Sequence, residues 1–170
     1  FLVTNGQEPD MIQRLQDEDA LPTQLYLSTN AADYDSFLKI NKPKYDDSWQ
    51  RWNRTLEMLK HLDTRTVLRI TLIRNYNDQK EMIPAFASML KKSSPHFIEI
   101  KSYMHIGRST NRLEHSNMLE MDEVKKFSDE IAKQSEIFSV MDESLVSRIV
   151  ILQNEQRVID RWISSYANTN

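Results

Sequence analysis

The sequence predicts an α/β fold, specifically part of a TIM-like (β/α) barrel that ends in a short antiparallel appendage. Two observations predict it. Segments rich in β-branched and apolar residues alternate with amphipathic helical segments, and this order implies parallel strands joined by right-handed crossovers. Each predicted strand also has one apolar and one polar face, whereas strands covered on both sides would be apolar on both. A barrel interior that holds a polar ligand explains the polar faces better than an open sheet does.

The N-terminal half contains two strand–helix units. Residues 1–4 form the first predicted strand, and the Asn-Gly pair that follows permits a sharp turn. Pro9 opens a short helix, and residues 24–28 form the second strand. The most regular helix spans about residues 47–62, where core packing explains an apolar face made of Trp49, Trp52, Leu56 and Leu59.

Two further units complete the predicted barrel part. β-branched residues predict a strand at 65–74, and a helix at about 78–92 separates it from a strand at 97–103. An irregular stretch at 104–121 leads into a helix that buries Val124, Phe127 and Ile131.

The C-terminal part is predicted to be β-structure. Residues 138–142 and 147–152 have the pattern of an antiparallel pair, and residues 158–162 are a candidate third strand. We therefore divide the chain into a barrel part, residues 1–136, and an appendage, residues 137–170, packed on the same domain.

Polar residues follow the strand ends, where the sites of (β/α) barrels lie. Arg69 and Thr71 alternate with apolar residues on one strand, as do Glu99, Lys101 and Tyr103 on the next. The alternative for the charged members is a structural ion-pair network between neighbouring strands, since buried charges need partners. The two interpretations can coexist. A lysine without a partner in such an interior could attack a carbonyl carbon as a neutral amine, which makes Lys101 the candidate catalytic residue.

Composition limits the classes of function. The 170 residues, 39% hydrophobic and 28% charged, are enough for one ordinary core. The absence of cysteine excludes disulfides, zinc–thiolate sites and cysteine-held iron–sulfur clusters within this chain. The four histidines lack metal-ligand spacing, so no metal site is predicted; we expect only His105 to face the site and the other three to lie on the surface. No apolar run reaches the roughly 20 residues of a membrane-spanning helix, which predicts a soluble, cytoplasmic protein.

The net charge of −3 hides an uneven distribution. Residues 1–38 carry one basic and seven acidic side chains, whereas residues 39–74 carry nine basic and four acidic ones. A local basic patch can attract nucleic-acid phosphates even on an acidic protein. The competing interpretation for any single patch is an ordinary solvated surface.

Several segments resemble the tRNA 4-demethylwyosine synthases, which are radical S-adenosylmethionine enzymes. The strands carry FLVTNG at 1–6, QLYLSTNA at 24–31, RTVLRITL at 65–72 and FIEIKSYM at 97–104. The loop after the last of these is the most specific segment, with Gly107, Ser109, Asn111-Arg112-Leu113 and Asn117-Met118. Asp142-Glu143 and residues 147–152 match the C-terminal strands of the family. The resemblance covers nearly the whole chain.

The resemblance implies a partial radical S-adenosylmethionine barrel whose first two strands and three-cysteine loop would precede residue 1. It implies condensation of pyruvate with N1-methylguanosine at tRNA position 37, with S-adenosylmethionine and a 4Fe-4S cluster as cofactors. The implied partners are tRNA, pyruvate and, as a candidate, a flavodoxin-like electron donor. A chain of this kind alone would be inactive, and its unprotected edge strand would favour self-association.

The resemblance also implies roles for single residues. Cofactor contacts are expected from Thr4, Asn5, Gly6, Ser28, Asn30, Arg69, Thr71 and Tyr103. Contacts to tRNA or substrate are expected from Arg108 and Arg112 on the loop and from His105, although Arg112 could instead hold its loop in place. Lys42, Lys44 and Arg74 are added as candidates because barrel order places them near this loop; Lys42 and Lys44 are not features shared with the family. Arg74 departs from the Lys-Gly ending expected on its strand.

Three alternatives remain open at this point. A different radical S-adenosylmethionine enzyme would share the early strand ends but not the loop at 107–118. A non-catalytic half-barrel that binds tRNA or serves as a scaffold accounts for the absence of cysteine. An unrelated barrel aldolase that forms a Schiff base on Lys101 fits the polar interior but not that loop.

Overall fold

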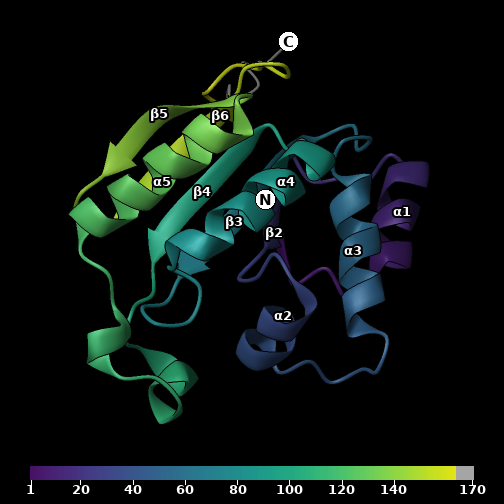
Figure 1. The fold of residues 1–170 in the computed structure, drawn as a ribbon. Coiled ribbons are helices and arrows are strands. Elements are labelled where there is room, and N and C mark those ends of the chain that lie inside the picture. Colours follow the sequence, from purple (N-terminus) through teal and green to yellow (C-terminus); the bar gives the residue numbers. More distant parts are fainter. Residues whose placement is uncertain (164–170) are drawn as a thin grey trace.

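The computed structural model describes residues 1–163, which form one mixed six-stranded sheet with helices against it (Figure 1). The strands are β1 (Leu2–Thr4), β2 (Gln24–Ser28), β3 (Arg65–Leu72), β4 (Phe97–Ser102), β5 (Phe138–Ser144) and β6 (Ile149–Asn154). The helices are α1 (Pro9–Asp17), α2 (Tyr34–Asn41), α3 (Ser48–Met58), α4 (Ile83–Ser93) and α5 (Met121–Ser135), with 3₁₀ turns η1 (Lys80–Met82), η2 (Gly107–Asn111) and η3 (His115–Asn117).

The sheet order is β1-β2-β3-β4-β6-β5. The first four strands pair in parallel, which confirms the predicted alternation of strands and helices. β6 pairs antiparallel with β4 and with β5, so the predicted C-terminal pair extends the same sheet. Within the described residues this sheet is open, with β1 and β5 as its outer strands.

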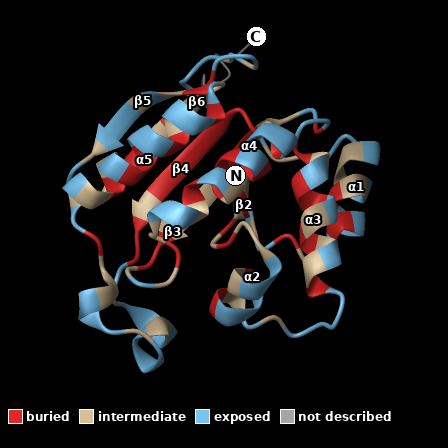
Figure 2. Cartoon of the chain, viewed as in Figure 1, coloured by how far each residue is buried: buried red, intermediate tan, exposed pale blue. Residues whose placement is uncertain are grey.

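The core lies between the sheet and the helices, because alternate strand residues point to that side. Leu68, Ile70 and Leu72 of β3 are fully buried, whereas Arg69 and Thr71 between them are half-buried on the opposite face. Figure 2 shows burial concentrated along β4 and on the inner sides of the helices. The predicted faces of the two longest helical patterns are confirmed by the burial of their members Trp52, Leu56, Leu59, Val124, Phe127 and Ile131.

One candidate strand is absent, and one helix was not predicted. Residues 158–162 form no strand, because their backbone is held by the Arg65 guanidinium, which donates to the carbonyls of Arg161 and Trp162. Helix α2 was not foreseen; it is only eight residues long, and Asp33 caps it by accepting the N–H of Ser36 at 2.9 Å. None of the helices in residues 1–163 is long and apolar enough to span a membrane.

His96 is buried at the start of β4, so its predicted surface position is wrong. The Thr66 backbone N–H donates to His96 Nδ1 at 3.1 Å, and the Thr66 hydroxyl lies 3.0 Å from the same nitrogen. Burial lowers the pKa of the His96 imidazole to about 4, and the charges of Arg157 and Arg65 act in the same direction.

The buried imidazole predicts a loss of stability in mild acid. The pKa of His96 is lower in the folded chain than in the unfolded chain. The stability that comes from burying the neutral imidazole is therefore fully present above pH 6.5 and is lost as the pH falls towards 4. The free energy of unfolding should fall by up to about 3 kcal/mol over this range. His96→Asn keeps an acceptor near the Nδ1 position and should flatten this part of the curve. Urea unfolding at several pH values tests this, and identical pH curves for the two proteins would contradict it.

Candidate functional site

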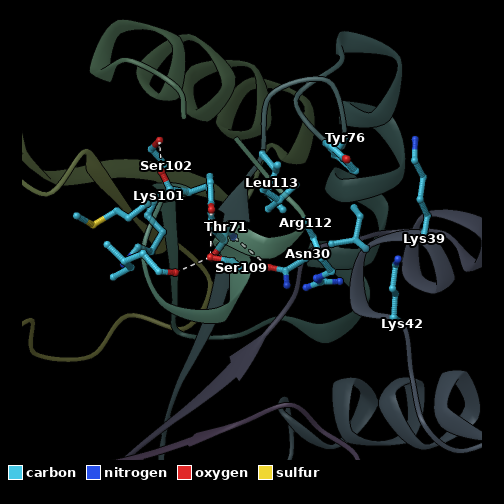
Figure 3. A pocket seen from close by; sticks show the side chains of 15 residues that line it. Asn30, Lys39, Lys42, Thr71, Tyr76, Lys101, Ser102, Ser109, Arg112 and Leu113 are labelled. Carbon is cyan, nitrogen blue, oxygen red and sulfur yellow. Dashed lines mark hydrogen bonds between the residues drawn. The ribbon is translucent and has the colours of Figure 1, made fainter. Parts of the chain in front are cut away.

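Two adjoining cavities lie at the carboxyl ends of the parallel strands. One, here called the Lys101 cavity, has a volume of about 580 Å³ and is shown in Figure 3. The other, the Asn5 cavity, has a volume of about 600 Å³. Both sizes lie within the usual range for small-molecule sites. The two cavities share the lining residues Asn30, Ile40, Lys42 and Arg112.

The Lys101 cavity combines an apolar floor with cationic walls. Its floor is a buried cluster of Ile40, Ile73 and Tyr103, with Tyr76 and Leu113 packed against it. In Figure 3, Lys101 and Ser102 lie at one end and Lys39 and Lys42 at the other, with Arg112 and Asn30 between them. No carboxylate is among its described lining residues. This charge distribution suits a ligand with an anionic group and an apolar body.

Lys101 takes no part in the nearest ion pair, which joins Arg69 and Glu99. Two residues earlier on the same face, Glu99 accepts from Arg69 Nε at 2.7 Å and from Nη2 at 3.2 Å, and the Arg69 guanidinium lies 4.4 Å from the centre of the Tyr26 ring. The structural ion-pair alternative therefore holds for Arg69 and Glu99. Lys101 is half-buried, and among residues 1–163 its ammonium group has no ion-pair partner.

Asn77 joins the ends of two strands, a role that the sequence did not indicate. Its amide donates to the carbonyls of Asn30 at 2.8 Å and Thr71 at 2.9 Å, and its Oδ1 accepts the N–H of Ile73 at 2.6 Å. Asn77 itself is fully buried. It therefore fixes Asn30, which lines both cavities, relative to Thr71, which lines the Lys101 cavity.

The Asn5 cavity is lined by strand-end residues of β1 and β2 and by the segment after α2. Its polar members include Asn5, Ser28, Asn30, Lys42 and Lys44. The Oε1 atom of Gln7, which also lines it, is buried and has no hydrogen-bond partner among the described residues. An unpaired buried acceptor beside amide, hydroxyl and ammonium groups fits a ligand that carries hydroxyl, amino and carboxylate groups.

Six predicted site residues line neither cavity: Thr4, Gly6, Arg69, Arg74, His105 and Arg108. Thr4 and Gly6 form the turn after β1, where the Thr4 hydroxyl accepts the Gly6 N–H at 3.0 Å. His105 Nδ1 lies 3.2 Å from the Tyr103 hydroxyl, and Arg108 is exposed on η2. The Arg74 guanidinium is paired with Glu123. The functional roles expected for all these residues stay predictions.

Comparisons with known proteins decide the relationship. Residues 92–154 match the family model described as Wyosine base formation. The chain is 36% identical over 155 residues to the S-adenosyl-L-methionine-dependent tRNA 4-demethylwyosine synthase of Pyrococcus abyssi, covering 91% of this chain and 45% of the relative. With the same synthase of Methanocaldococcus jannaschii it shares 40% identity over 162 residues, which cover 94% of this chain and 48% of the relative. This chain is similar to the tRNA 4-demethylwyosine synthases over nearly its whole length. It spans about half the length of these relatives.

Solved structures agree with this similarity. A structure of TYW1 with a lysine-pyruvate adduct bound matches with a TM-score of 0.79 and 39% identity, covering 92% of this chain and 47% of that one. Archaeal TYW1 matches with a TM-score of 0.71 and 34% identity, again covering 92% of this chain and 47% of that one. Coproporphyrinogen III oxidase of Escherichia coli, a radical SAM enzyme, is 12% identical with a TM-score of 0.51, a likeness of fold alone. The resemblance inferred from the strand and loop motifs is therefore confirmed.

Proposed function

We propose that this chain forms the substrate-binding part of a cytoplasmic radical S-adenosylmethionine synthase that condenses pyruvate with N1-methylguanosine at position 37 of tRNA to give 4-demethylwyosine. The observation that carries this proposal is the Lys101 cavity, in which an ammonium group without an ion-pair partner among residues 1–163 lies above an apolar floor. Pyruvate combines a carboxylate, a ketone and a methyl group. Such a ligand suits this combination of charge and apolar surface.

In this proposal residues 1–136 are part of a radical S-adenosylmethionine barrel and residues 137–170 are an appendage of the same domain. The parallel order of β1 to β4 supports the barrel, because four strands with helices on one face are what a section of such a barrel contains. The pairing of β6 with β4 supports the appendage.

The two expected cofactors fit this chain unequally. The chain has no cysteine, and residues 1–163 contain no cluster of histidine and carboxylate side chains able to hold a metal ion, so the chain offers no site for a 4Fe-4S cluster. The Asn5 cavity does fit S-adenosylmethionine, whose hydroxyl, amino and carboxylate groups match Asn5, Ser28, Asn30 and Gln7 Oε1, which has no hydrogen-bond partner in the described part of the chain. When bound, that cofactor would supply the radical that starts the reaction.

We assign the pyruvate contact to Lys101. From the wall of the cavity its Nζ atom could bind the carboxylate, or could attack the ketone carbon and form an imine with loss of one water molecule. The lysine-pyruvate adduct in the structure of a 39% identical relative supports chemistry of this kind. Thr71 and Tyr103 line the same cavity and would orient the ligand.

Basic residues around the cavities are proposed to bind tRNA phosphates. Lys42 lines both cavities, Lys44 lines the Asn5 cavity, and Arg112 is exposed between the two, with Arg108 on the same loop. The donor set suits an anticodon loop whose modified base is drawn out of the stack, since enzymes that act on a base must reach it there.

This arrangement predicts salt-sensitive RNA binding by the chain. Arg112→Gln should weaken binding of an anticodon stem–loop about tenfold and reduce the slope of log Kd against log salt by about one. Lys133→Gln removes an exposed charge at the end of α5 and should leave both quantities unchanged. Fluorescence anisotropy at several salt concentrations measures both quantities. Equal losses in the two variants would count against a phosphate contact by Arg112.

A chimera tests the whole proposal. This chain would replace the corresponding segment of the Methanocaldococcus jannaschii relative, with which it shares 40% identity. The purified and reconstituted chimera should form 4-demethylwyosine on tRNA carrying N1-methylguanosine at position 37, as detected by mass spectrometry of nucleosides. A folded chimera that holds its cluster but forms no product would contradict the proposal.

The absence of cysteine favours one alternative, a non-catalytic half-barrel that binds tRNA or serves as a scaffold. Such a module has no reason to keep the catalytic geometry. In that case the chain would bind the stem–loop and the chimera would remain inactive.

A further inference from the structure

Arg74, just after β3, lies within a dense set of contacts to the far end of the loop between β4 and α5. Its backbone N–H donates to the Asn117 carbonyl at 2.9 Å, and the Asn117 side-chain amide donates back to the Arg74 carbonyl at 3.1 Å. Its guanidinium donates to the Met118 carbonyl at 2.9 Å and to both carboxylate oxygens of Glu123 at 2.7 and 2.6 Å. Such bidentate pairing fixes both position and orientation.

Glu123 is itself held in place at the start of α5. The Glu120 N–H donates to its carboxylate at 2.7 Å as part of a capping box. Burial alone would raise the pKa of the Glu123 carboxyl, but this N–H and the Arg74 guanidinium hold it below its usual value. Arg74 is therefore tied to a helix end that its own capping box already holds.

The near end of the same loop is pinned separately. The Tyr103 hydroxyl donates to Ser109 Oγ at 3.1 Å, and Ser109 Oγ–H donates to the Ile106 carbonyl at 2.6 Å. Between the two anchors lie Arg112, which lines both cavities, and Leu113, which packs on the floor of the Lys101 cavity. Figure 1 shows this loop extending beyond the sheet, on the same side as α2.

We propose that Arg74 is a positioning residue, which clamps the loop at residues 104–118 so that Arg112 and Leu113 form a fixed wall of the Lys101 cavity. This inference deepens the proposed function and rests on it for the role of Arg112. It also replaces the direct RNA contact expected of Arg74 from the sequence, since the guanidinium is already occupied by Glu123 and Met118. Pre-ordering a binding loop lowers the entropic cost of binding.

Limited proteolysis tests the clamp without RNA. Arg108 and Arg112 are trypsin sites within the loop, and Lys44 is an exposed site outside it. Arg74→Gln should raise the cleavage rate after Arg108 and Arg112, relative to that after Lys44, by about tenfold, because local opening of the loop becomes easier. Lys125 lies on α5, the helix that carries Glu123, and forms an exposed ion pair with Glu143 of β5; Lys125→Gln breaks that pair and should leave this ratio unchanged. General unfolding would raise all the rates together.

An unchanged ratio in folded Arg74→Gln would overturn the clamp. If that variant does not fold, Glu123→Gln serves instead, because it keeps the Arg74 contact with Met118 and removes the charge of its partner. The same ratio is then expected to rise, and its failure to rise is equally decisive.

A double-mutant cycle tests whether Arg74 affects RNA binding by positioning Arg112. Arg74→Gln should weaken binding of the anticodon stem–loop several-fold in the wild-type background, but should have no further effect in the Arg112→Gln background. Independent, additive losses would show that Arg74 contacts RNA itself and would overturn the positioning role. If the wild-type chain binds no RNA, the proposed RNA contacts fail, and the trypsin ratio alone decides on the clamp.

Discussion

Lys101→Met is expected to abolish formation of 4-demethylwyosine by the chimera, with a loss on the order of a thousandfold. Lys101 is a cation in a cavity without carboxylates, and among residues 1–163 it has no ion-pair partner that would give it a structural task. Methionine has a similar length and keeps the packing of the aliphatic part. Global stability should therefore change little, and the loss should appear as a lower rate of product formation in single-turnover assays.

Lys101→Arg separates the two ways in which Lys101 could bind pyruvate. A guanidinium keeps the positive charge and can bind a carboxylate, but it cannot form an imine. Activity in Lys101→Arg close to that of the unmutated chimera would show that only charge is needed. Loss of activity in both variants, together with borohydride trapping of pyruvate on the unmutated chimera alone, would show covalent chemistry. Full activity of Lys101→Met would exclude Lys101 from the reaction.

Periodic patterns predicted the elements that are held by the core. Strand β2 begins and ends at the predicted residues 24 and 28, and the helix that buries Val124, Phe127 and Ile131 is α5. The failures involve segments whose conformation depends on distant partners. Residues 158–162 contain apolar residues, but Arg65, almost a hundred residues earlier, holds the carbonyl of Trp162. Local pattern carries no information about such a contact.

The same limit applies to the site. The carboxyl ends of parallel strands meet at one edge of the sheet. From the sequence alone we could therefore predict that Ser28, Asn30, Thr71 and Lys101 lie near one another, and they line the two cavities. It could not tell which charged groups are already paired. Arg69 meets Glu99 thirty residues away, and Arg74 meets Glu123 forty-nine residues away. Asn77 was missed because an asparagine in a turn usually bonds its own backbone, whereas here it also spans two strands.

Gly6→Ala is expected to lower the free energy of unfolding by about 2–4 kcal/mol, from backbone strain together with overpacking. Gly6 has a φ of +73°, and a Cβ atom there would lie 2.7 Å from Leu27 Cδ1 and 3.2 Å from Trp52 Cδ1. Leu27 is fully buried and Trp52 nearly so, so neither side chain can move aside freely.

Gly107→Ala is the matched control, because its φ of +63° is similar but no atom of residues 1–163 lies within 4 Å of the added Cβ. It should therefore lose only the cost of the left-handed backbone, about 1–2 kcal/mol. Urea unfolding of both variants gives the difference, which isolates the crowding at Gly6. A clear difference means that packing fixes the turn after β1, and with it the place of Asn5 in its cavity. Equal losses would mean that Leu27 yields, and that this turn is free to change shape around a ligand.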